Sequence, residues 1–98
     1  MVLKLNDCKT KLRNFRQKYG QVMGINRIGI FGSVARGENR DGSDIDIVVD
    51  IVQPSFKSMN EIHSHLKELF DCDVDLVRYR QSLRPRFKQN IDKEAVYV

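Results

Sequence analysis

Residues 32–50 read GSVARGENRDGSDIDIVVD, and they place a glycine–serine pair and two nearby aspartates between two apolar segments. The segments 28–31 and 44–49 are short and rich in β-branched residues, so both are predicted strands. Successive side chains on a strand point to opposite faces. Asp44 and Asp46 are therefore expected on one face of the second strand, with the isoleucines that alternate with them on the other.

Two carboxylates side by side on a strand repel each other by about 4 kcal/mol at a distance of ~4 Å and an effective dielectric constant of about 20. A hard cation between them relieves this repulsion, and Mg²⁺ binds one or two carboxylates together with waters and substrate phosphate oxygens. Gly32 lets the backbone come close to a phosphate, and the helix start after it aims N–H groups at an anion. The segment therefore predicts a metal–nucleotide site.

The pattern of Gly-Ser, ten residues and Asp-x-Asp, with VARG at 34–37, resembles the nucleotidyltransferase superfamily that includes DNA polymerase beta. Within it, the chain is most similar to the minimal nucleotidyltransferases (MNT proteins), and the similarity covers nearly its whole length. Asp-x-Asp alone occurs in many surface loops. The full spacing with a predicted strand on either side is far more specific.

The resemblance implies three metal-binding and catalytic acids. Asp44 and Asp46 are two of them, and the family's third acid lies in a segment like VDLV at 74–77, which corresponds to Asp75. Asp73, two residues earlier, is the alternative. The family's chemistry needs Mg²⁺, up to two ions, and transfers a nucleoside monophosphate from ATP by in-line attack at the α-phosphorus.

The resemblance also implies that Gly32 and Ser33 hold the β- and γ-phosphates of ATP. Residues 33–36 are predicted to form a short helix, and Ser33 also suits its N-cap, a role compatible with phosphate contact. Arg36 has two interpretations. It contacts phosphate, or it braces the following loop through Asp41 or Glu38.

Larger relatives attach domains that bind antibiotic or RNA, so a bare catalytic domain is expected to find its acceptor on another chain. Minimal nucleotidyltransferases commonly accompany a HEPN-domain protein in a toxin–antitoxin pair, where they add AMP to a tyrosine of the HEPN RNase. The leading hypothesis is this antitoxin activity. The alternatives are a non-catalytic nucleotide-binding subunit that neutralises or scaffolds a partner, and a transferase acting on RNA ends or a small molecule.

The composition indicates one globular domain spanning residues 1–98, with 41% hydrophobic and 31% charged residues. The sequence has neither an apolar run of about 18 residues nor a visible signal peptide, so a cytoplasmic protein without membrane contact is expected. Cys8 and Cys72 lack metal-ligand spacing and are expected to be free thiols.

The flanking segments predict further helices and strands. Apolar residues at three- and four-residue spacing predict a helix over 7–19, with Asn6 as N-cap and Gly20 as its end. Ser55 or Ser58 caps a second helix that reaches Phe70. Its expected buried face comprises Phe56, Met59, Ile62, Leu66, Leu69 and Phe70, while His63 and His65 are expected to be exposed.

A third strand over 74–77, a last helix from about residue 83 and a short strand over 95–98 complete the expected fold. This is an α+β fold, close to α/β: a small mixed sheet with helices packed against it, in which the family's strand order brings the three acids to one end. Basic residues gather near the C-terminus, where the alternatives are a solvated face, a nucleic-acid surface, an acidic partner and the approach of the triphosphate; of protein and nucleic acid, a protein interface is favoured. They are Arg78, Arg80, Arg84, Arg86 and Lys88.

Overall fold

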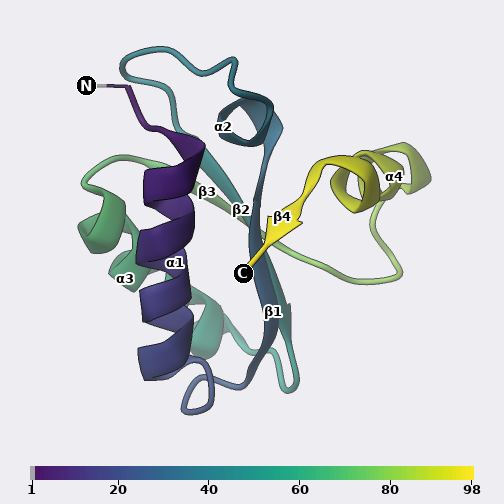
Figure 1. Ribbon diagram of the computed structural model, residues 1–98. Helices are drawn as coiled ribbons and strands as arrows, with labels where there is room; N and C mark the ends of the chain where they lie inside the picture. Colours follow the sequence, from purple (N-terminus) through teal and green to yellow (C-terminus); the bar gives the residue numbers. More distant parts are fainter. Residues whose placement is uncertain (1) are drawn as a thin grey trace.

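A mixed β-sheet lies at the centre of the structure, a computed structural model that describes residues 2–98 (Figure 1). Within these residues four strands follow the spatial order β3-β2-β1-β4. The strands are β1 (Ile25–Phe31), β2 (Ile45–Ile51), β3 (Val74–Arg78) and β4 (Val96–Tyr97). β1 is antiparallel to both β2 and β4, whereas β2 and β3 are parallel. The expected small mixed sheet is confirmed.

Helices cover both faces of this sheet. The helices are α1 (Leu5–Tyr19), α2 (Gly32–Arg36), α3 (Phe56–Phe70) and α4 (Pro85–Glu94). Figure 1 shows α1 and α3 together on one face, α4 on the other, and the short α2 at the upper end of the sheet, next to the ends of β1 and β2. The arrangement confirms the α+β fold.

β2 carries the core because its side chains alternate between two apolar layers. Ile45, Ile47 and Val49 are fully buried in the layer between the sheet and helices α1 and α3. Val48 is fully buried in the opposite layer, where Phe31, Leu83 and Ile91 also lie. Asp46 has the same strand parity as Val48, so its side chain belongs to the face that α4 covers.

The predicted end of α1 at Tyr19, with Gly20 directly after it, is confirmed, but the predicted start is two residues too late. The helix begins at Leu5, with Lys4 rather than Asn6 in the N-cap position, because Leu5 packs against the main core and extends the helix. Gly20 keeps helical dihedral angles, with φ of −55° and ψ of −46°. The left-handed glycine that turns the chain towards β1 is Gly24, at φ of 67°.

α3 matches its predicted end and its predicted buried face, except at Phe56. Ser55 and Ser58 form a reciprocal capping box, so both predicted serines take part. Phe56 is 90% exposed, against expectation, since at about 100° per residue it lies well outside the stripe of Ile62 and Leu66.

The two histidines of α3 are half-buried, which corrects their expected exposure. They flank the buried stripe on its two sides. His63 Nε2 lies 2.8 Å from the carbonyl oxygen of Val74 and donates to it, while the His65 ring lies 4.8 Å from the ring of Tyr19.

The predictions for the two cysteines and for the C-terminal helix and strand are confirmed. Cys8 is buried, Cys72 is half-buried and both are free thiols, and burial raises the pKa of each. The predicted C-terminal helix and closing strand correspond to α4 and β4. Among residues 2–98 no helix has both the length and the apolar character needed to span a membrane.

Candidate functional site

The register of the sheet brings two of the predicted acids together. Asp46 on β2 and Asp75 on β3 are paired in the parallel ladder. Asp46 is also the antiparallel partner of Phe31, the residue directly before Gly32. Asp44 lies one residue before β2 and is exposed. Two acids and the glycine–serine turn therefore meet at the same end of the sheet.

Gly32 turns the chain from β1 into α2 directly against Asp46. Its φ is 70°, a left-handed conformation that other residues rarely adopt, and a Cβ atom at this position would collide with Oδ2 of Asp46. Val34 is fully buried and anchors α2 on the core. Phe31, not Ser33, takes the N-cap position, so the predicted capping role of Ser33 is wrong. The backbone conformation of Gly32 and the packing of Val34 together hold this turn against the carboxylate of Asp46.

Asp46 lies close enough to both other predicted acids for their charges to affect its pKa. Burial raises the pKa of Asp46, and the negative charges of Asp75 and Asp44 raise it further, as does a side-chain hydrogen bond with Asp75. Arg36 opposes this shift through its positive charge. The site thus accumulates negative charge, which Arg36 partly offsets.

The carboxylates fit a magnesium ion whose coordination shell is completed by oxygen atoms of the substrate. In residues 2–98 no three acidic, histidine or cysteine side chains already form a metal-binding cluster. Mg²⁺ does not require one, since it is held by one or two carboxylates together with waters and substrate phosphates. The pair of Asp46 and Asp75, with Asp44 beside it, supplies the hard oxygen ligands such an ion prefers. Burial and then the charges of Asp75 and Asp44 raise the pKa of Asp46, and an ion would neutralise those charges.

The comparisons with known proteins agree with this geometry. Residues 10–98 match the family described as Polymerase beta, Nucleotidyltransferase. The chain belongs to this family. The protein adenylyltransferase MntA of Thermococcus cleftensis is 34% identical over 98 residues, which cover 99% of this chain and 98% of that relative.

Solved structures show the same fold. One, described as a candidate minimal nucleotidyltransferase, has a TM-score of 0.80 and 27% identity, covering 96% of this chain and 95% of that one. Another, a crystal structure of a variant of the toxin–antitoxin pair MntA–HpeT, has a TM-score of 0.68 and 26% identity, covering 99% of this chain and 72% of that one. The chain is accordingly a nucleotidyltransferase.

Arg36 links the phosphate turn of this nucleotidyltransferase to α4. Its Nε donates to Glu38 at 3.0 Å, one of the two loop partners expected from the sequence. Its Nη1 donates to Glu94 at 3.0 Å, a partner that sequence reasoning missed. Glu94 is 58 residues away, and its position opposite Arg36 depends on how α4 packs across the sheet.

Asp73 is less well placed than Asp75 to act as the third acid. Its carboxylate lies 3.9 Å from Lys67 Nζ on α3, and its side chain is 79% exposed. Its carbonyl oxygen, not its carboxylate, meets β2, accepting from the backbone N–H of Ile45 at 3.2 Å. The register with Asp46 favours Asp75.

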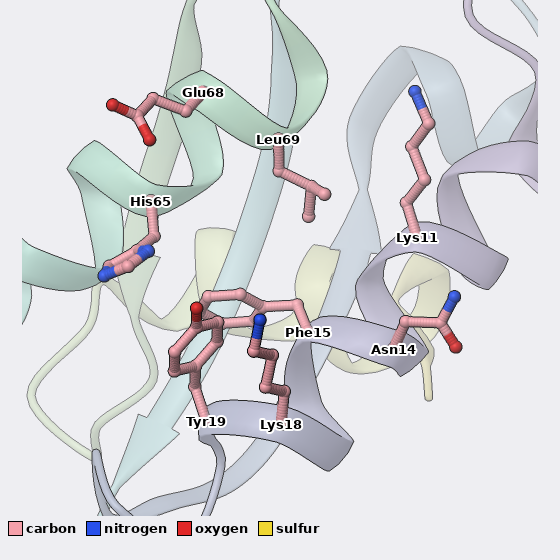
Figure 2. Close-up of a pocket in the computed structure, with 8 residues that line it drawn as sticks. All are labelled: Lys11, Asn14, Phe15, Lys18, Tyr19, His65, Glu68 and Leu69. Carbon is pink, nitrogen blue, oxygen red and sulfur yellow. The ribbon is translucent and has the colours of Figure 1, made fainter.

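A groove of about 390 Å³ lies between α1 and α3, on the face of the sheet opposite the acids (Figure 2). Figure 2 shows that its walls combine two lysines with aromatic rings and one carboxylate. Its lining residues are Lys11, Asn14, Phe15, Lys18, Tyr19, His65, Glu68 and Leu69. Because it lacks a pair of carboxylates, this groove does not offer the metal chemistry of the site around Asp46.

Proposed function

We propose that this nucleotidyltransferase transfers AMP from ATP, with Mg²⁺, to a tyrosine of a HEPN-domain RNase toxin and thereby acts as its antitoxin. The observation that carries the proposal is the contact of Gly32 with Asp46, which is paired with Asp75. This closeness supports a site in which the turn at Gly32 would bind phosphate beside the carboxylate pair. The protein acceptor is supported by the full-length similarity to the protein adenylyltransferase MntA.

The proposal of a toxin partner rests on a solved structure and on the family resemblance. The solved structure of MntA–HpeT, at 26% identity, is described as a toxin–antitoxin pair. The HEPN identity of the toxin follows from the family resemblance of the sequence. The C-terminal arginines Arg84 and Arg86, exposed at the start of α4, offer charged contacts to such a partner.

In the proposed reaction Gly32 and Ser33 bind the β- and γ-phosphates, because the left-handed glycine lets backbone N–H groups approach them. Asp44, Asp46 and Asp75 would hold one or two Mg²⁺ ions, which would neutralise charge on the leaving pyrophosphate and lower the pKa of the attacking hydroxyl. The tyrosine oxygen forms the new bond to the α-phosphorus as the bond to pyrophosphate breaks. Asp75 would ligate this hydroxyl or accept its proton.

The test is the intact mass of a candidate HEPN-domain toxin after its purified complex with this protein is incubated with Mg²⁺ and ATP. The expected result is a mass increase of one or more AMP groups, located on a tyrosine by peptide sequencing. An unmodified toxin that is nevertheless neutralised would contradict the proposal and identify a binding antitoxin. Labelled RNA in place of labelled protein would identify an RNA-directed transferase.

A matched pair of aspartates on one strand controls this test. Asp46→Asn should abolish transfer, whereas Asp50→Asn should leave it intact. Asp50 lies on the same strand and face as Asp46, but its carboxylate pairs with Arg27 at 3.5 Å. Asp75→Asn should nearly abolish transfer and Asp73→Asn should not; the reverse order would assign the third acid to Asp73.

A further inference from the structure

The rotation of α4 about its axis is fixed by two contacts on opposite sides of the helix. On one side Glu94 accepts from Arg36 of α2 at 3.0 Å. On the other side Asp92 accepts from the hydroxyl of Tyr79 at 2.8 Å. Residues seven positions apart on a helix are separated by only about 20° around its axis. Phe87 therefore lies on the side of Glu94, which faces α2 and the phosphate turn.

Phe87 continues an aromatic surface that starts beside the acids. Its ring centroid is 6.1 Å from that of Phe31, at an interplanar angle of 73°. Phe31 is 8% exposed, pairs with Asp46 and directly precedes Gly32. Phe87 is 36% exposed. A partly uncovered ring thus stands next to the residue that leads into the phosphate turn.

We propose that Phe87 is the platform on which the base of the nucleotide stacks, an inference that rests on the proposed nucleotidyltransferase site. A triphosphate held at Gly32 with its α-phosphate near Asp46 must direct its base away from both. Phe87 is a large apolar ring on that side, one layer beyond Phe31. Aromatic rings bind the faces of bases favourably. The exposed cations Arg84 and Arg86 near it also favour an anionic ligand.

A tryptophan in place of Phe87 tests this directly, because the chain has no tryptophan of its own. The fluorescence of F87W should be quenched in a saturable manner by Mg²⁺–ATP and not by Mg²⁺–tripolyphosphate, which has the phosphates without a base. F56W is the matched control. Phe56 is also exposed, at 90%, but begins α3, so F56W should respond to neither.

Removal of the ring gives the second measurement. F87A should bind Mg²⁺–ATP about tenfold more weakly or worse while keeping wild-type affinity for tripolyphosphate, and F56A should match wild type in both. If ATP raises the melting temperature of F87W yet leaves its fluorescence unchanged, and F87A retains full affinity, the stacking platform is refuted and the nucleotide site stands. If ATP binds to neither wild type nor variants, both the platform and the proposed site fail.

Discussion

Gly32 is the residue whose replacement should do the most damage. Gly32→Ala adds a Cβ against Oδ2 of Asp46 and also forces a side chain into a left-handed conformation. Gly37 provides the control, since its φ is 72° but no atom lies within 4 Å of its Cβ position. We expect Gly37→Ala to lose about 1 kcal/mol of unfolding free energy, and Gly32→Ala to lose more and to stop binding ATP. Equal losses of stability with ATP binding intact would contradict this placement of the turn.

Asp46 should make stability depend on pH. Because burial and its acidic neighbours raise the pKa of Asp46, the folded protein keeps this proton to higher pH than the unfolded chain does. The free energy of unfolding therefore falls as the pH rises through the pKa of the folded state. Asp46→Asn removes this loss, so it should gain at most about 1 kcal/mol at about pH 7, after solvent screening, and nothing at about pH 3. Denaturant melts that show Asp46→Asn less stable than wild type at neutral pH would contradict it.

Gly32, Asp44 and Asp46 could be predicted from the sequence because short sequence patterns identify them. A glycine before a short helix and two aspartates at strand spacing are local patterns, and the family resemblance supplied Asp75. Glu94 and Phe87 were not accessible, because each acquires its neighbour only when α4 packs across the sheet. The sequence offered no local signal for a contact between residues 36 and 94.

The junction of α2 with α4 distinguishes the two interpretations of Arg36. If Arg36 contacts phosphate, Arg36→Ala should weaken ATP binding about tenfold, since hydrogen bonds to charged groups contribute about 1.5–3 kcal/mol. Glu94→Gln should change ATP affinity little and stability by under about 1 kcal/mol, because both partners are partly exposed. Calorimetric titrations of both variants measure this. The same loss of affinity in both would mean that Arg36 only braces the loop and α4.

The helices and strands themselves followed from periodicity, but their limits and order did not. α1 starts two residues before its predicted start because Leu5 gains core contact, and Phe56 is exposed because its place around α3 lies outside the buried stripe. The start of α1 and the exposure of Phe56 both depend on how far the neighbouring helices and strands extend. The family resemblance gave only the convergence of the acids at one end of the sheet. The strand order β3-β2-β1-β4 is a finding of the structure, since hydrophobic patterns do not determine which strands pair.

The excess positive charge of the molecule lies in two segments of the chain. α1 carries five basic residues against one acidic residue, an excess of four that equals the net charge of +4 for the whole chain. The acids of the site lie on the other face, under α4. Residues 78–94 carry an equal excess, six basic against two acidic residues. The predicted role of the C-terminal basic residues in binding a protein partner concerns this region near the site.

The site as a whole is tested most directly by the stabilisation that Mg²⁺–ATP gives to wild type and to Asp46→Asn. A ligand that binds only the folded form, at about 100 times its dissociation constant, adds roughly 2.7 kcal/mol to the unfolding free energy. Thermal melts in EDTA and in Mg²⁺–ATP should show a rise of this size for wild type and almost none for Asp46→Asn, which should already melt higher in EDTA. Equal ligand-induced shifts in the two proteins would mean that these acids do not form the metal–nucleotide site.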